Sequence, residues 1–405
     1  MVAEPREIRD GTVTTPRGFL AGATYAGLKT YGVDKLDLGI LFSERPATAA
    51  GVFSTNHIVS PSVTLSKRHI ASGYARAIVA NSGCANCCVG PQGLKDAQEV
   101  VAIASRKLGV AAEEILVCST GLIGVELPMA LLRQAIPKVQ LSADGGHALA
   151  RAIMTTDSRP KEAGVSFTID GVEASIGGIA KGAGMIHPNM ATMLCFMTTD
   201  LAVEPGFLQR ALREAADASF NMVSVDGDSS TNDSLLLLAN GTAGNKEVRE
   251  GTPQGDAFRQ ALEAVCVTLA QAIAYEGEGA TKGLEVVVEG ARTLEDARCI
   301  ARSVASSSLV KTALHGNDPN WGRIMMALGK TKAYVEEGKV ALYINDVCIL
   351  EEGRPIPFLR DAVVKIMSET RVSFRIQLNL GDSSARAWGC DLSEEYVTFN
   401  SAYTT

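Results

Sequence analysis

The sequence predicts a fold that mixes helices and strands, of the α/β or α+β class, with mixed or largely antiparallel sheets. Three observations support this prediction. Helical and strand-like apolar patterns alternate along most of the chain. A β-hairpin pattern occupies residues 164–180, around Asp170-Gly171. After about Gly290 the pattern becomes richer in strands, which predicts a smaller C-terminal α/β domain over residues 290–405.

The region before the hairpin contains three helix patterns and one strand pattern. Residues 93–109 place their apolar side chains on one broad face and end at a glycine that suits a helix C-cap. The string ILVCSTG at 115–121 is typical of a short strand that ends in a turn. Two shorter helices are expected at 127–136, with Pro128 at the first helical position, and at 143–154.

The region after the hairpin begins with an uninterrupted apolar run at 193–197, which is typical of a buried strand. Helix and strand patterns then alternate, with helices expected at 204–220 and 256–277 and strands at 284–290, 340–346 and 371–380.

Composition places the chain among globular proteins. Its 405 residues are 46% apolar and 20% charged, and at about 100–200 residues per domain they predict two or three domains. The net charge of −7 argues against nucleic acid as a partner. No apolar run approaches the ~20 residues that span a bilayer, and MVAEPREIRD does not resemble a signal peptide. We therefore expect a cytoplasmic protein that binds neither membranes nor nucleic acid.

The nine cysteines are scattered and odd in number, which favours reduced thiols over disulfides. Four lie within apolar runs, as core cysteines do: Cys118, Cys195, Cys266 and Cys348. CANCC at 84–88 contains a C-x-x-C, but no second pair and no nearby histidine accompany it. SVDGDSSTND at 224–233 lacks the glutamate that an EF-hand loop needs at its twelfth position, so we expect a polar turn there. No metal site is expected.

The stretch KGAGMIHPNMATMLCFMTTD, residues 181–200, places Thr192 between a turn and a buried strand. Its glycines and His187-Pro188-Asn189 predict a turn or kink. In one interpretation Thr192 simply suits the first position of a strand, and this stretch alone favours that interpretation. In the other, Thr192 is a nucleophile that a rigid element holds in place.

Five strings across nearly the whole chain resemble the ornithine acetyltransferase family of the arginine pathway, also called glutamate N-acetyltransferase. They are STGLIG at 119–124, KGAGMIHPNMATML at 181–194, SVDGDSSTND at 224–233, GEGATK at 277–282 and GNDPNWGR at 316–323. The resemblance implies a layered sandwich of sheets flanked by helices, as in DmpA-like proteins. The chain departs from the family pattern in NSGCANCCVG, where the family has NSGNANA, so that Cys84 and Cys87 differ.

The resemblance implies that the chain cuts itself between Ala191 and Thr192, giving fragments 1–191 and 192–405. The chemistry agrees, because an N-to-O acyl shift needs a hydroxyl or thiol on the residue after the scissile bond. Cleavage frees an α-amine on Thr192, whose pKa near ~7.7–8.0 leaves a useful fraction neutral. That amine can act as general base for the hydroxyl. The resemblance therefore favours the nucleophile interpretation.

By the same resemblance, Thr192 takes the acetyl group of N2-acetyl-L-ornithine and passes it to L-glutamate. Thr120 and Gly121 would form the oxyanion hole, which stabilises the tetrahedral intermediate. Substrate contacts are implied at Thr155, Lys181, Thr192, Glu278, Asn400 and Thr405. Lys181 would pair with the α-carboxylate of the substrate, and Glu278 with the ammonium group of the ornithine side chain. Fragment 1–191 would thus donate the oxyanion hole and Lys181.

The resemblance also implies partners and leaves alternatives open. No cofactor is expected, although acetyl-CoA is a possible second acetyl donor. The expected partners are amino-acid substrates and the chain's own other fragment, in a heterotetramer with two copies of each. One alternative is a self-processed amidohydrolase or aminopeptidase of the same architecture, in which water resolves the acyl-enzyme. The other is an unprocessed amino-acid-binding protein.

Overall fold

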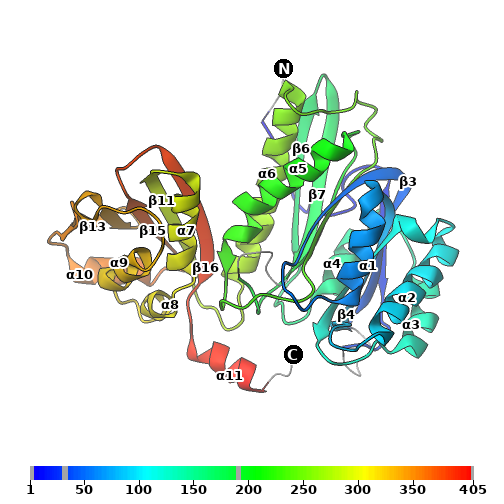
Figure 1. Cartoon of the computed structure of the whole chain (residues 1–405), viewed down its shortest axis with the longest axis horizontal. Helices are drawn as coiled ribbons and strands as arrows, with labels where there is room; N and C mark the ends of the chain where they lie inside the picture. Colours follow the sequence, from blue (N-terminus) through cyan, green and yellow to red (C-terminus); the bar gives the residue numbers. More distant parts are fainter. Residues whose placement is uncertain (1–3, 30–34, 188–192, 403–405) are drawn as a thin grey trace.

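The computed structural model describes residues 4–29, 35–187 and 193–402, which form a larger and a smaller lobe (Figure 1). The strands of the larger lobe are β1 (Arg6–Glu7), β2 (Phe19–Thr24), β3 (Leu38–Phe53), β4 (Tyr74–Cys84), β5 (Ile115–Leu122), β6 (Lys161–Ile169), β7 (Val172–Lys181), β8 (Leu194–Thr199) and β10 (Ser234–Ala239). They form one sheet in the order β1-β6-β7-β8-β10-β3-β4-β5, with β2 paired to β3. The pairs β4–β5 and β8–β10 are parallel and the other pairs are antiparallel. The prediction of a mixed sheet is confirmed.

The smaller lobe holds a second mixed sheet. Its strands are β9 (Val223–Ser224), β11 (Gly283–Ala291), β12 (Ala341–Ile344), β13 (Val347–Glu351), β14 (Arg354–Pro355), β15 (Arg371–Gln377) and β16 (Ser383–Cys390). They lie in the order β14-β13-β12-β15-β11-β16-β9. The domain boundary expected near Gly290 falls at the end of β11, inside this sheet.

Helices cover both sheets. The α-helices are α1 (Pro61–His69), α2 (Gln92–Leu108), α3 (Met129–Ala135), α4 (Gly146–Ile153), α5 (Pro205–Ala218), α6 (Pro253–Tyr275), α7 (Leu294–Ala305), α8 (Ser308–His315), α9 (Trp321–Gly329), α10 (Arg360–Met367) and α11 (Glu394–Ala402). Short 3₁₀ helices lie at Ile70–Ser72, Ala112–Glu114, Ile136–Lys138, Phe220–Met222 and Glu337–Lys339. Across the described residues, no helix is both long enough and apolar enough to pass through a membrane.

Local capping chemistry sets where the long helices begin. The Glu204 side chain accepts the backbone N–H groups of Gly206 and Phe207 at 2.9 and 2.6 Å, so α5 begins where the sequence predicts. Helix α6 begins three residues earlier than predicted, because Thr252 caps it and Pro253 suits its first turn. Pro128 proves to be the N-cap of α3 rather than its first helical residue.

The larger sheet is buried on both faces, and its strand residues alternate between two cores. Along β8, Cys195 and Met197 join the core beneath α5 and α6, whereas Leu194 and Phe196 join the core that contains the buried side of α4. This two-sided burial explains the uninterrupted apolar run that predicts the strand. Cys118, Cys195 and Cys266 are buried free thiols as expected, but Cys348 is only half-buried.

A single apolar core joins the two lobes. It runs from the larger sheet through α5 and α6 to the second sheet, where Trp388 is 2% exposed. Past β16 the chain leaves the smaller lobe, and α11 returns towards the larger lobe at the lower edge of Figure 1. The C-terminal helix thereby reaches the cavity described next.

Candidate active site

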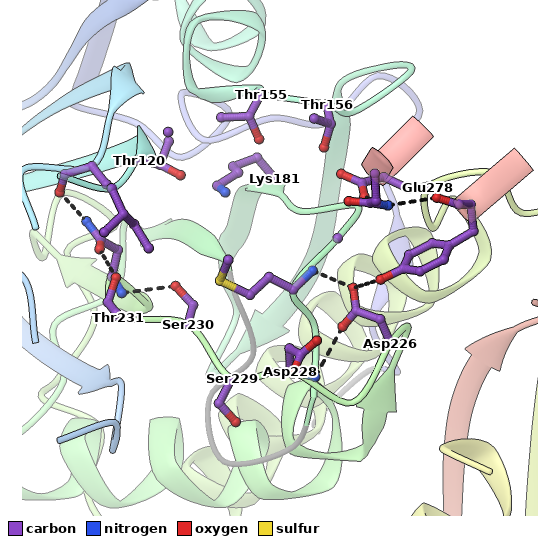
Figure 2. A pocket seen from close by; sticks show the side chains of 18 residues that line it. Thr120, Thr155, Thr156, Lys181, Asp226, Asp228, Ser229, Ser230, Thr231 and Glu278 are labelled. Atoms are coloured by element: carbon purple, nitrogen blue, oxygen red, sulfur yellow. Dashed lines mark hydrogen bonds between the residues drawn. The ribbon is translucent and has the colours of Figure 1, made fainter. Parts of the chain in front are cut away.

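A cavity of about 440 Å³ lies where the ends of β5 and β7, the turn after β9, the loop after α6 and helix α11 meet. Six predicted site residues line it: Thr120, Gly121, Thr155, Lys181, Glu278 and Asn400. These residues come from positions up to 280 apart in the sequence and face one space (Figure 2). The predicted residues Ala191, Thr192 and Thr405 lie outside the described residues.

Thr120 lies near the end of β5, where the hydrogen bonds of other side chains hold the strand. The neighbouring Ser119 hydroxyl donates to Asn81 at 2.7 Å, and the Asn232 amide donates to the Ser119 carbonyl at 2.8 Å. The same Asn232 amide donates to the carbonyl of Ala85 at 2.6 Å. None of these hydrogen bonds uses the Thr120 hydroxyl, which lines the cavity and can therefore serve as a donor towards a ligand.

Gly121 follows with a backbone that only glycine adopts easily. Its φ is +126°, and a Cβ there would overlap the backbone of Gly83 on the neighbouring strand. Gly121 lies beside Thr120 at the cavity wall, near the end of β5. A side-chain hydroxyl and a backbone amide at adjacent positions are the groups that the predicted oxyanion hole requires.

Lys181, at the end of β7, is 2% exposed and directs its ammonium group into the space bordered by Thr120 and Thr155 (Figure 2). Burial lowers the pKa of Lys181, while the negative charges of Asp157 and Asp233 oppose that shift. Asp157 itself binds the Lys161 ammonium at 2.6 Å and the Gly182 N–H at 2.7 Å. Burial alone would raise the pKa of Asp157, but Lys161 and Lys181 outweigh it, so its pKa is lowered.

Three carboxylates line the opposite part of the cavity: Glu278, Asp226 and Asp228. The Asn400 amide of α11 donates to Glu278 Oε2 at 3.0 Å. A Cβ at Gly184 would overlap the Glu278 carboxylate, so only glycine there leaves this side chain in place. The cavity is therefore dipolar, with a cation near Thr120 and anions near α11, which suits a ligand that carries charges of both signs.

Asp226 ties three separate segments together. Its carboxylate accepts the N–H groups of Met185 and Ile186 at 2.6 and 2.9 Å. It also accepts the Asp228 N–H at 3.2 Å and the Tyr396 hydroxyl at 3.3 Å. Burial raises the pKa of Asp226, although these backbone donors oppose the shift. Asp226 thus fixes the approach to the predicted cleavage site and docks α11 against it.

Asp233 holds the chain on the other side of the predicted cleavage site. Its Oδ1 accepts the N–H of Met193 at 3.0 Å, and the Met193 carbonyl accepts the Ser234 N–H at 3.1 Å. Asp233 is fully buried, and burial raises its pKa well above the usual range, with the Met193 hydrogen bond and Lys181 opposing. The residue that follows Thr192 is thereby locked at the start of β8.

Sequence reasoning missed Asp226, Asp228 and Tyr396. SVDGDSSTND is predicted as a polar turn, and its residues from Asp226 to Asn232 line the cavity with the exception of Gly227. The signal was its density of hydroxyl, amide and carboxyl side chains. Tyr396 carried no comparable signal, because its role depends on the return of α11.

Comparison with known proteins gives a consistent result. The model of the ArgJ family matches residues 20–405. The Arginine biosynthesis bifunctional protein ArgJ of Dehalococcoides mccartyi (strain CBDB1) is 49% identical over 98% of both chains. The protein of the same name from Symbiobacterium thermophilum is 48% identical over 98% of this chain and 99% of its own.

A solved structure, that of Arginine biosynthesis bifunctional protein ArgJ from Bacillus halodurans, is 37% identical, with a TM-score of 0.50. The match covers 51% of this chain and 98% of the solved one. The family resemblance inferred from the five motifs is confirmed. With a family model and curated relatives that match almost its entire length, the chain belongs to the ArgJ family.

Proposed function

We propose that this ArgJ-family enzyme transfers the acetyl group of N2-acetyl-L-ornithine to L-glutamate through an acetyl-Thr192 intermediate. The reaction yields L-ornithine and N-acetyl-L-glutamate. It follows autocleavage between Ala191 and Thr192, which frees the Thr192 amine to act as general base. Two copies of each fragment would make up the active assembly, and acetyl-CoA would serve as a second donor.

One observation supports the proposal: the cavity joins the predicted oxyanion hole at the end of β5 to charged groups of both signs. Thr120 and Gly121 line it beside Lys181, and Glu278 lies on the acidic side. An acetylated amino acid brings an amide to attack, an α-carboxylate and, in ornithine, a side-chain ammonium. Lys181 suits the carboxylate and Glu278 suits the ammonium.

Support for autocleavage comes from the lengths of the related chains. The curated relatives match 98% of this chain. The Bacillus halodurans chain matches over 98% of itself, but this match covers only 51% of the present chain. That solved polypeptide is therefore about half as long, as a chain cut near its middle would be.

Further support comes from the two carboxylates that flank the predicted cleavage site. Asp226 fixes Met185 and Ile186 on one side, and Asp233 fixes Met193 on the other. The chain is thus anchored both before and after the predicted cleavage site. Orientation of this kind can supply a large part of a rate enhancement, because the entropy of alignment is lost during folding rather than during reaction.

A two-donor assay tests the function. Purified enzyme is incubated with L-glutamate and either N2-acetyl-L-ornithine or acetyl-CoA, and N-acetyl-L-glutamate is measured. We expect product from both donors. If deacetylation of N2-acetyl-L-ornithine proceeds equally without glutamate, the enzyme is a hydrolase and the proposal is wrong. A single band on a denaturing gel would instead favour the unprocessed binding protein.

Glu278→Gln should impair the use of N2-acetyl-L-ornithine more than the use of glutamate as acceptor. The substitution keeps the shape of the side chain and removes its charge. Ornithine loses an ion pair, worth about 3–5 kcal/mol if buried or about 0–1 kcal/mol if solvated. Glutamate loses a repulsive neighbour. The two half-reactions are separated by first loading the acetyl group and then adding glutamate.

The matched control for this variant is Glu395→Gln, which neutralises an exposed carboxylate on the same helix that carries Asn400. It should leave both half-reactions unchanged. Equal losses of rate in both half-reactions of Glu278→Gln would mean that Glu278 shapes the site but does not bind the ammonium group of ornithine.

Asp226→Asn should slow autocleavage by about tenfold or more, the effect of losing about 1.5–3 kcal/mol from a hydrogen bond to a charged group. The amide nitrogen of asparagine cannot accept the N–H of Met185 or Ile186, so one of these contacts becomes repulsive. The appearance of the two fragments with time on a denaturing gel measures the rate.

Tyr396→Phe is the control, because it removes only the hydroxyl that donates to Asp226 at 3.3 Å. It should slow cleavage less than Asp226→Asn. Cleavage of Asp226→Asn at the unmodified rate would show that the chain before the scissile bond needs no such anchor.

A further inference from the structure

A second cavity, of about 380 Å³, lies where the smaller lobe meets the segment that leads to the predicted cleavage site. Arg302 enters it from the last turn of α7, and Lys330 and Lys332 from the end of α9 and the turn that follows. His187 contributes the wall on the side of the larger lobe. Neither the predicted reaction nor any site residue discussed above uses this cavity.

The charge of this cavity is distinctive. Its lining contains Arg302, Lys330 and Lys332 and, among the described residues, no carboxylate. Arg302 makes one ion pair at 3.4 Å, with Glu295, whose side chain is 76% exposed. Lys330 and Lys332 are exposed, and neither forms an ion pair with another described residue. Their charges are therefore available to a ligand.

Local structure does not neutralise these cations. Arg302 lies in the last turn of α7, and Lys330 is the C-cap of α9, where helix dipoles favour positive charge. Each dipole end is equivalent to roughly half a negative charge, so the two together offset only about one of the three positive charges. Burial and the nearby Arg302 lower the pKa of His187, which keeps this histidine neutral at neutral pH.

The substrate cavity has the opposite character. It contains Lys181 but also the carboxylates Asp226, Asp228 and Glu278, and these would repel a multiply charged phosphate ester. A phosphorylated acetyl donor must therefore place its phosphate groups elsewhere. His187 follows Met185, which lines the substrate cavity, by two residues. Their Cα atoms are at most about 7 Å apart, so the two cavities are close neighbours.

We propose that the cavity formed by Arg302, Lys330 and Lys332 is a phosphate subsite that holds the phosphate groups of a coenzyme A thioester. Arginine can grip a phosphate through two parallel hydrogen bonds, and lysines add point charges. The flexible thioester arm would then enter the substrate cavity. This inference rests on the proposed function, because it supplies the site for the second donor.

The subsite would serve transfer of the acetyl group from the thioester to glutamate. The thioester C–S bond breaks, and the acetyl carbon bonds first to the Thr192 oxygen and then to the amine nitrogen of glutamate. The amine gives up a proton, and the coenzyme leaves as a thiol that carries one proton. No oxidant or reductant is needed.

The test is a triple variant, Arg302→Gln, Lys330→Gln and Lys332→Gln, in the processed full-length enzyme. Calorimetric titration measures the binding of coenzyme A, adenosine 3′,5′-bisphosphate and inorganic phosphate. We expect coenzyme A to bind about tenfold more weakly to the variant, which is within the range that the loss of three exposed ion pairs gives. The KM for acetyl-CoA should rise in parallel, while transfer from N2-acetyl-L-ornithine stays unchanged.

The control variant, Arg354→Gln with Lys365→Gln, removes two exposed cations elsewhere on the smaller lobe and should leave coenzyme A binding unchanged. Undiminished binding of coenzyme A to the triple variant would overturn the proposal, as would the absence of binding to the unmodified enzyme. Equal affinity for inorganic phosphate and coenzyme A would overturn the assignment to a coenzyme. Failure of transfer from N2-acetyl-L-ornithine in the unmodified enzyme would refute the proposed function, and the titration would still decide the subsite.

Discussion

Thr192→Ala should leave a single uncut chain without acetyl transfer activity. Both reactions need the hydroxyl oxygen, first to attack the carbonyl of Ala191 and then to accept the acetyl group. The flanking anchors bind backbone groups of neighbouring residues: Asp226 binds the backbone of residues 185 and 186, and Asp233 binds that of residue 193. The variant should therefore fold, and its effects should be chemical.

The measurement is the intact mass of the purified variant, together with its rate of N-acetyl-L-glutamate formation. Thr192→Ser serves as the matched control, because it keeps the hydroxyl and loses the methyl group that restricts χ1. It should still cleave and transfer, at lower rates. If Thr192→Ala is recovered as two fragments cut at residue 191, the autocleavage hypothesis is wrong.

Elements with strong local signals were predictable from the sequence. Helix α5 has an amphipathic face, a proline at its first position and a glutamate at its N-cap, and all three signals agree with its position in the fold. Strand β3, sixteen residues long, was not predicted. It contains Pro46, and its pairing with β4 shifts register between Phe42 and Ala47. A proline and a bulge interrupt the alternation on which strand prediction depends.

The residues that line the site were easier to predict from the sequence than the hydrogen bonds that join them. Four of the five motifs contribute residues to one cavity, whereas GNDPNWGR at 316–323 contributes none of its lining residues. Asp226 accepts hydrogen bonds from Met185 and Tyr396, which lie on two other segments, and no local sequence pattern predicts these bonds. These hydrogen bonds depend on the path of the chain in space, above all on the position of α11 beside the cavity. The spacing of residues in the sequence does not predict them.

Thr120→Ala should lower kcat by about 10²–10³-fold while changing KM much less. A donor that faces developing charge stabilises the transition state more than the bound substrate, and removing one such donor typically has this effect. The variant removes the hydroxyl and one methyl group, while the end of β5 stays held by the hydrogen bonds among Ser119, Asn81 and Asn232. Gly121 would still offer its N–H, so residual activity is expected. Steady-state kinetics with N2-acetyl-L-ornithine and glutamate measure both constants.

Comparison with Thr120→Ser separates chemistry from packing. Serine keeps the donor and loses a methyl group at a position that is 4% exposed, so it should retain most of the kcat that alanine loses. If one oxyanion site serves both reactions, autocleavage of Thr120→Ala should slow as well. Equal losses in the serine and alanine variants would attribute the effect to packing, since only the alanine variant lacks the donor. An unchanged kcat in Thr120→Ala would remove this hydroxyl from the mechanism and leave the backbone N–H of Gly121 as the predicted donor that remains.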